Sequence, residues 1–391
     1  MNNKFRKNIK SDYIYCFIKN FDLSSAIWVL YLAYKGISLW QIGILQGIYH
    51  FTSLISEIPS GALADLIGRK KIIIIGRLFS AISNVIMLLS NSFLGFAIAF
   101  IFSAWAYNLN SGSEEALVYD SLKLLGKENK YIKVNSRLNV IAEVSQGIST
   151  FVGGIIAQYS YVYCYLAIIL ICVISFIAAF LFNEPIDETI NTDNNEKIDF
   201  KKHFLLCKGI LAKDKKIRKI LLYYPIVFSF NAVLFIYGQQ YFSNLGLEII
   251  EISIVMLAAG LMSCIGALCS KKTLKIFKHK TIYIVSLLLC IGIISMFLNN
   301  LIISIIGIMT SSFANSILYP IQSSSLNKLI PSEQRATFIS IDSMVFSLSM
   351  VVIFPATGIF ADIIGLNNMF FFLGVILLFM IKNFTVDTTY M

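Results

Sequence analysis

Twelve apolar stretches follow one another along this chain of 391 residues, each near the length of a membrane-spanning helix. A helix rises about 1.5 Å per residue, so a hydrocarbon core about 30 Å thick requires roughly 20 apolar residues. The stretches cover residues 11–34, 39–66, 70–92, 93–122, 134–158, 160–183, 217–244, 248–270, 279–299, 300–328, 335–363 and 366–385. With 57% hydrophobic and 14% charged residues, a water-soluble fold could not bury so much apolar surface. We therefore predict an all-α integral membrane protein with twelve transmembrane helices in the lipid bilayer.

Lysine and arginine are concentrated in alternate connections between these stretches. The basic clusters lie at 4–10, 69–71, 123–133, 197–219, 271–280 and 328–335, whereas the other connections hold only Lys35. Because cytoplasmic loops of membrane proteins carry the excess of basic residues, both termini are expected in the cytoplasm. The net charge of +10 thus follows from topology, and we expect no nucleic-acid partner. Frequent Ile, Asn and Lys residues suggest an AT-rich bacterial genome, and we therefore expect the protein in a bacterial cytoplasmic membrane.

One long polar segment divides the chain into two halves. It starts at Asn183 and is rich in Asn, Asp, Glu and Lys, which is typical of a solvated linker. We therefore predict a six-helix bundle over 1–183, a cytoplasmic linker over 184–216 and a second six-helix bundle over 217–391. The stretches "GALADLIGRKK" and "GALCSKKTLKIFKHK" leave the second span of each half, which indicates a weak internal repeat.

The loop between the second and third spans carries a spaced set of small and charged residues: Gly61, Leu63, Ala64, Asp65, Gly68, Arg69 and Lys70. This spacing resembles the G-x-L-a-D-r-x-G-r-k signature of the major facilitator superfamily, with Leu66 in place of the second-turn arginine. The resemblance implies two pseudo-symmetric six-helix bundles, alternating access and a small-molecule substrate.

The resemblance also implies a contact between this loop and the second half when the transporter faces outward. We expect Asp65 to lie near the start of the span at 335–363, where free backbone amides carry a positive partial charge. Asp120, at the end of the fourth span, is placed to pair with Arg69. Our hypothesis is a latch between conformations made by Gly61, Asp65, Gly68, Arg69, Asp120 and Arg335.

The fifth span carries a partial antiporter pattern. Gly153 and Gly154 supply its glycine pair and Ser145, Ser149 and Thr150 its small residues, but the proline of the family pattern is absent. This favours export, although the same residues also allow close helix packing. The family's mid-span arginine of span four falls near Asn108, so a proton relay based on that arginine cannot be carried over.

Acidic residues within the spans are candidates for proton coupling, because a charge in the bilayer costs several kcal/mol unless it has a partner or faces a cavity. Low dielectric favours the protonated form of a carboxylate, so such a group can take up and release protons. The candidates are Asp22, Glu114, Glu143 and Glu57, with Asp22 and Glu114 preferred. The alternative is structural ion pairing, of Asp22 with Lys19 at i,i+3, or of Glu143 with Arg137 or Arg77.

Polar and aromatic residues within the spans are candidates for substrate contacts. They are His50, Asn108, Asn231, Tyr237, Gln239, Asn315, Tyr319 and Gln322. The resemblance implies that spans one, four, seven and ten line the cavity, and aromatic faces with nearby acids suit lipophilic or cationic compounds. The alternative is packing between helices and contact with lipid.

Our leading hypothesis is secondary active transport, in which a monomer exports small amphipathic compounds in a proton-coupled process. Uptake of a small metabolite by proton symport is the first alternative, and a non-transporting membrane sensor or enzyme is the second. We find no metal-ligand set, nucleophile motif or phosphate-binding loop in the sequence, so we expect neither an enzyme nor a bound cofactor or metal.

Overall fold

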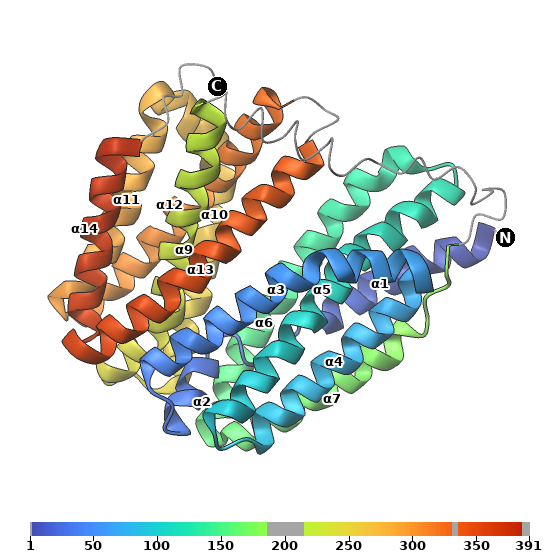
Figure 1. Ribbon diagram of the computed structural model, residues 1–391, viewed down its shortest axis with the longest axis horizontal. Coiled ribbons are helices and arrows are strands. Elements are labelled where there is room, and N and C mark those ends of the chain that lie inside the picture. Colours follow the sequence, from blue (N-terminus) through green and yellow to red (C-terminus); the bar gives the residue numbers. More distant parts are fainter. Residues whose placement is uncertain (1, 186–214, 331–334, 385–391) are drawn as a thin grey trace. The chain divides into compact units, whose positions relative to one another are not determined.

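The computed structural model describes residues 2–185, 215–330 and 335–384, and within them every regular element is a helix (Figure 1). The helices are α1 (Asn2–Lys19), α2 (Trp28–Tyr34), α3 (Leu39–Ile67), α4 (Arg69–Leu89), α5 (Phe93–Leu124), α6 (Tyr131–Tyr159), α7 (Tyr161–Ala179), α9 (Lys215–Asn244), α10 (Ile249–Phe277), α11 (Thr281–Ser295), α12 (Leu301–Leu329), α13 (Arg335–Ile364) and α14 (Leu366–Phe384). Short 3-10 turns cover Glu128–Lys130, Lys278–Lys280 and Met296–Leu298. Each predicted span has a helical counterpart, so the all-α prediction is confirmed.

The chain divides into two compact units. The first comprises Met1–Ile37, Leu45–Asn194 and Glu248–Ser253, and the second comprises Ser38–Ile44, Asn195–Leu247 and Ile254–Met391. Most of the predicted linker at 184–216 lies outside the described residues, so the predicted domain boundaries stay predictions.

The first span differs from the prediction of one continuous helix over 11–34. Helix α1 begins at Asn2 and ends at Lys19, and α2 begins only at Trp28. Between them, Asp22 Oδ1 accepts hydrogen bonds from the backbone N–H (2.9 Å) and the hydroxyl (2.7 Å) of Ser24. An aspartate that bonds the backbone two residues ahead stabilises a turn in competition with a helix. The i,i+3 pairing of Lys19 with Asp22 is therefore wrong.

Helices α5 and α12 begin at capping residues. Ser92 accepts from Gly95 N–H at the start of α5, and Asn300 accepts from Ile303 N–H at the start of α12. Side-chain oxygens of this kind satisfy backbone donors that have no partner within the helix. Gly68 precedes α4 with φ +96°, a backbone conformation that glycine adopts without strain.

The core of the first unit lies where α1, α4, α5 and α7 meet. Tyr15, Ile73, Leu117 and Phe182 form one buried cluster, in which the Tyr15 and Phe182 rings meet edge to face at 5.1 Å. A Cβ at Gly153 of α6 would overlap the carbonyl oxygen of Leu23. The helix therefore approaches the turn after α1 at backbone distance, as small residues permit.

The core of the second unit combines close helix packing with buried tyrosines. Helices α11 and α12 approach so closely that a Cβ at Gly292 would lie 2.6 Å from the carbonyl oxygen of Gly307. The Tyr223 hydroxyl donates to Ser286 Oγ at 2.7 Å and the Tyr241 hydroxyl to the Met296 carbonyl at 2.7 Å. These two buried tyrosines thus have acceptors inside the bundle.

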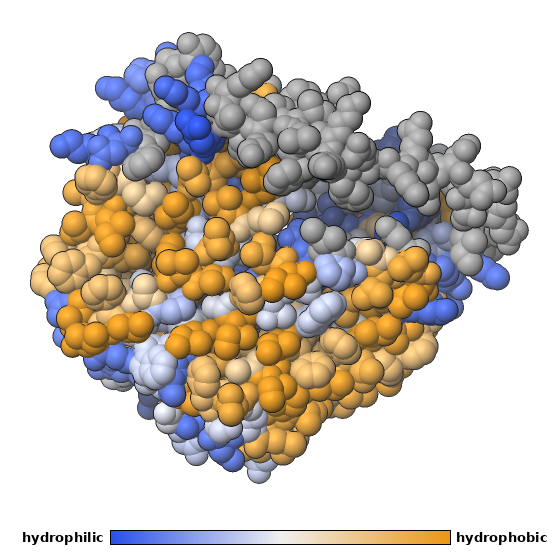
Figure 2. Space-filling model, in the orientation of Figure 1, coloured by the Kyte–Doolittle hydropathy of each residue, from blue (hydrophilic) through white to orange (hydrophobic). Residues whose placement is uncertain are grey.

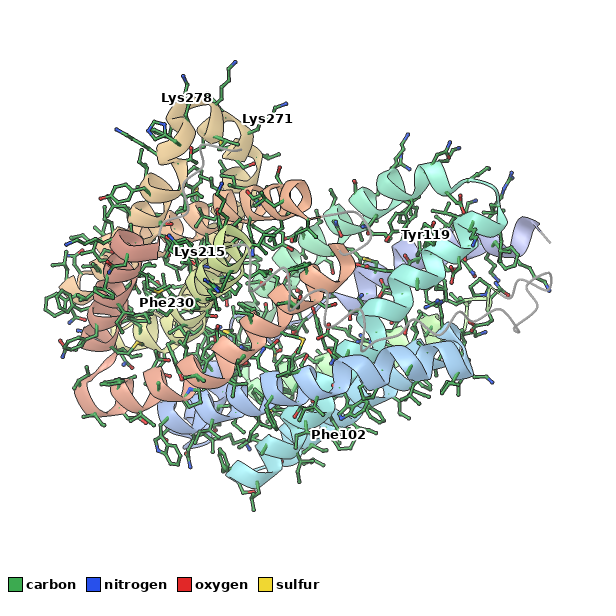
Figure 3. All side chains as sticks on the ribbon, turned by 45° about the horizontal axis from the view of Figure 1, so that its top comes forward. Phe102, Tyr119, Lys215, Phe230, Lys271 and Lys278 are labelled. Carbon is green, nitrogen blue, oxygen red and sulfur yellow. The ribbon has the colours of Figure 1, made fainter. Side chains whose placement is uncertain are left out.

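The helix surfaces suit a bilayer. Nine helical stretches in the described residues are long and apolar enough to cross a membrane, one of which runs from Ile249 to Leu298 and covers both α10 and α11. Large apolar side chains such as Leu268 and Leu94 are exposed, and Figure 2 shows apolar residues over much of the visible face. Lys271 and Lys278 instead project from the end of the α10–α11 pair (Figure 3). Apolar flanks with basic ends are typical of membrane helices.

Candidate functional site

A cavity of about 340 Å³ lies within the first unit, between the α1–α2 turn and helices α3, α4, α5 and α7. Its charged lining residues are Lys19, Asp22 and Arg77. Polar lining residues include Ser24, Gln46, Tyr49, Ser80, Ser83, Asn84, Ser103, Tyr107, Tyr165, Cys172 and Ser175. A concave site of this volume with a few polar groups among apolar ones is typical of a small-molecule site.

An ion pair lies beside the cavity. Lys19, the last residue of α1, donates from Nζ to Oε2 of Glu114 on α5. Glu114 is buried, with 7% of its surface exposed. Lys19 is one of the residues that line the cavity. Removing one partner of such a pair leaves the other charge without compensation.

A second carboxylate, missed in the sequence, lies near this pair. Asp12 is fully buried in α1, and neither carboxylate oxygen has a hydrogen-bond partner among the described residues. Its charge is repelled by Glu114 and attracted by Lys19. Asp12 precedes Lys19 by seven residues and hence lies on the same helix face, which is the signal that could have identified it. Asp12, Lys19 and Glu114 form what we call the carboxylate cluster.

Two side chains that line the cavity carry buried hydrogen-bond donors without a partner in what the structure describes. Arg77 of α4 is only 8% exposed, and its Nε has no hydrogen-bond partner within the described part of the chain. The hydroxyl of Tyr165 on α7 is likewise buried without a partner in the residues described. Both side chains line the cavity. A buried donor without an acceptor is unfavourable, so these two groups mark a place where an acceptor would be stabilised.

The remaining predicted acids occupy different surroundings. Asp22 is exposed and lines the cavity near Lys19. Glu57 on α3 and Glu143 on α6 are exposed, and neither forms an ion pair or lines the cavity as far as the described residues show. The structure therefore brings Glu114 and Asp22 to the cavity region and leaves Glu57 and Glu143 apart from it.

Asn108, one of the two predicted substrate contacts of the first unit, lies at a contact between helices. Asn108 Nδ2 donates to the Ser53 carbonyl (2.6 Å) and to Ser56 Oγ (2.8 Å), while its Oδ1 accepts from Ser53 Oγ (2.9 Å). These bonds join α5 to α3. The half-buried His50 ring meets Tyr49 edge to face at 5.2 Å. A substrate role for either residue stays a prediction.

Three predicted contacts in the second unit are engaged in hydrogen bonds between helices. Asn231 Oδ1 accepts from Ser311 Oγ at 3.0 Å, and the Tyr237 hydroxyl donates to the Phe354 carbonyl at 3.2 Å. Buried Gln322 donates from Nε2 to Oδ1 of Asp342 at 2.6 Å. These bonds position α9, α12 and α13.

The other three predicted residues of this unit differ in exposure. Gln239 is fully buried in α9. Asn315 Oδ1 is buried and has no partner among the described groups. Tyr319 is 64% exposed, with its ring 5.9 Å from that of Phe228. Their roles as substrate contacts stay predictions.

The signature loop is organised around a residue that the sequence analysis overlooked. Glu184 accepts from the backbone N–H of Arg69 (Oε1, 2.7 Å) and of Lys70 (Oε2, 2.8 Å), so its carboxylate caps α4. A Cβ at Gly68 would lie 2.9 Å from Glu184 Oε2, so a larger residue there would require the carboxylate to shift. An anion at a helix N-terminus is stabilised by the free amides and the helix dipole.

Two further contacts hold this arrangement. Arg69 Nε donates to Asp120 Oδ2 at 2.8 Å, the pairing expected from the sequence. The fully buried Asn8 donates to the Asn183 carbonyl (2.8 Å) and accepts from Asn183 N–H (2.8 Å), which fixes the residue before Glu184. Gly61 lies in α3, and the side chains of Asp65 and Arg335 lie outside the described part of the structure.

Replacing Glu184 by Ala is expected to lower the stability of the protein by about 0.5–2 kcal/mol, the usual effect of losing a helix N-cap. The reason is that two α4 amides lose their acceptor. Thermal unfolding in detergent measures this, with Glu128→Ala, which removes an exposed acid, as the control. Equal unfolding midpoints for both variants would contradict the capping role.

Comparison with known proteins identifies the class of protein. The sequence pattern of the Major Facilitator Superfamily matches residues 16–298 and 228–387, and the chain therefore belongs to this family of membrane transporters. It is 24% identical over 371 residues to the uncharacterized MFS-type transporter YxaM of Bacillus subtilis, covering 93% of this chain and 91% of that protein. The resemblance found in the signature loop is thus confirmed, and the chain is a multi-pass membrane transporter.

Solved structures agree on the fold. A crystal structure of the nucleoside transporter NupG superimposes with a TM-score of 0.79 at 11% identity, covering 100% of this chain and 100% of that chain. A crystal structure of a D-xylose-proton symporter gives a TM-score of 0.75 at 14% identity, covering 100% and 99%. At such identities the likeness concerns the fold alone.

Proposed function

We propose that this protein is a proton-coupled secondary transporter that exports small amphipathic compounds by alternating access. The observation that supports it is the carboxylate cluster, in which buried Glu114 pairs with Lys19 beside a second buried acid, Asp12. Two acids that share one cation favour the uptake of a proton, because like charges in low dielectric repel.

The proposed mechanism follows from this pairing. A proton on Glu114 removes the charge that holds Lys19, and the ammonium group then faces the cavity that it lines. Release of the proton restores the ion pair. A compound in the cavity and a proton on Glu114 would therefore influence each other through Lys19, which is a coupling between two sites.

Two observations bear on direction. The partial antiporter pattern at Gly153 favours export, although Gly153 also packs against the turn after α1. One structural neighbour is a D-xylose-proton symporter, which supports uptake of a metabolite as the alternative. We propose export with both termini in the cytoplasm, and the experiment must separate the two directions.

Inverted membrane vesicles acidified by respiration and containing a pH-sensitive dye provide the test. Adding an exported compound outside these vesicles should draw protons out and restore dye fluorescence. Recovery only in vesicles preloaded with the compound would instead establish uptake by symport. A panel of amphipathic acids, cations and neutral dyes that moves no protons in either arrangement would contradict proton coupling.

We further propose that the signature loop acts as a latch between conformations. Glu184 and Asp120 hold the start of α4 from two sides, and Asp65 lies three residues before Gly68, near the end of α3. Asp65→Asn is expected to slow transport several-fold while binding of the compound is retained. Unchanged turnover, measured against Glu128→Gln as the control, would exclude the latch.

A further inference from the structure

We propose that the cavity of the first unit binds the carboxylate of an amphipathic acid, with Arg77 as its counter-charge and Tyr165 as a second donor. This inference rests on the proposed transport function, since it names the substrate class of that transporter. It reverses the preference for lipophilic or cationic compounds that was expected from the sequence.

Arg77 is the buried cation at the cavity for which no ion pair is seen among the described residues. Lys19 is neutralised by Glu114, and Asp22 is exposed and bonded to Ser24 in the turn. Arg77 is more than nine-tenths buried, yet its Nε lacks an acceptor in the described residues. A guanidinium group has five donors in a planar fork that matches a carboxylate, so an incoming acid would satisfy it.

The Tyr165 hydroxyl supplies independent support. It lies on α7, whereas Arg77 lies on α4, and both reach the same cavity. The hydroxyl is buried without an acceptor among the described residues, whereas the buried hydroxyls of Tyr223 and Tyr241 each have one. Two orphaned donors from two helices indicate an acceptor group of the ligand.

The rest of the cavity suits an apolar or aromatic body. Trp28, Phe100, Tyr49 and Tyr107 are among its lining residues, and the rings of Trp28 and Phe100 meet edge to face at 5.8 Å. The volume of about 340 Å³ lies at the lower end of the range for small-molecule pockets. A small aromatic acid fits this combination.

Trp28 provides a reporter inside the cavity. The chain has 3 tryptophans, so Trp40→Phe with Trp105→Phe leaves Trp28 alone to fluoresce. The probes are 4-nitrobenzoate and 4-nitrobenzamide, which quench tryptophan and have similar shapes but differ in charge. Purified protein should show saturable quenching, with the acid bound about tenfold or more tighter than the amide, since a charge-assisted bond is roughly twice as strong as a neutral one. Equal affinities for the two probes would overturn the proposal.

Substitutions of Arg77 and Tyr165 test whether these residues cause the preference for the acid over the amide. Arg77→Gln should abolish the preference for the acid, Arg77→Lys should retain most of it, and Arg137→Gln, which removes an exposed cation on α6, should leave it unchanged. Tyr165→Phe keeps the ring and should weaken acid binding several-fold while sparing the amide. Retention of the full preference in Arg77→Gln would overturn the proposal, and the wild-type comparison of acid with amide tests it even where a variant does not fold. The assay contains no proton gradient, so its failure is distinct from a failure of proton coupling.

Discussion

Replacing Glu114 by Gln is expected to eliminate proton flux coupled to a transported compound, down to the level of vesicles without the protein. The amide keeps the shape of the side chain but cannot exchange a proton, so Lys19 has no titrating partner. The dye assay in inverted vesicles measures this loss. Passive exchange of the compound between the two sides should persist, because the cavity itself is intact.

Glu115 supplies the matched control for this prediction. It is the next residue on α5 and is exposed, so Glu115→Gln makes the same chemical change outside the carboxylate cluster. Proton flux should survive in this variant. Coupled flux that survives in Glu114→Gln as well would remove Glu114 from the proton pathway.

Replacing Gly153 by Ala is expected to destabilise the protein by about 1–3 kcal/mol, the range for overpacking a close contact. The new methyl group would overlap the Leu23 carbonyl oxygen, and a backbone atom cannot move aside as a flexible side chain can. The turn after α1 would shift, and with it Asp22 and the cavity wall. The midpoint of thermal unfolding in detergent measures the effect.

Gly112 is the control for this second prediction. It lies in α5, and a Cβ there would meet no described atom within 4 Å. Gly112→Ala should therefore be neutral or stabilising by up to about 1 kcal/mol, because alanine is the better helix former. Replacing glycine by alanine is thus expected to destabilise the protein at position 153 but not at position 112. Equal changes in stability would contradict the packing described for Gly153.

The helical spans could be predicted because their signal is local. Runs of apolar residues near 20 in length and basic loops between them identify α3 to α14 without knowledge of any contact. The break in the first span could not be predicted because the polar residues Lys19, Asn20 and Asp22 interrupt the apolar 11–34 stretch only briefly, and an aspartate that stabilises a turn resembles one inside a helix. The start of α1 at Asn2 was missed because its first residues are polar and basic.

The candidate site was predicted only in part, because its contacts join distant residues. The sequence indicates Glu114 as a candidate, but its partner Lys19 is 95 positions away, and the local alternative for Lys19 was Asp22. The sequence offers Arg77 only as one of two alternative ion-pair partners of Glu143, whereas in the structure Arg77 lines the cavity. Glu184 was considered part of a linker, since capping of α4 by a residue 115 positions along the chain leaves no local pattern.

Proton binding by the carboxylate cluster can be measured directly and without knowing the transported compound. Infrared difference spectra of the purified protein, recorded between mildly alkaline and mildly acidic buffer, report carboxyl groups that gain a proton. We predict a protonated-carboxyl band in the wild type that is lost in Glu114→Gln and retained in Glu115→Gln. A spectrum that is identical in the wild type and in the Asp12→Asn, Glu114→Gln double variant would contradict the account.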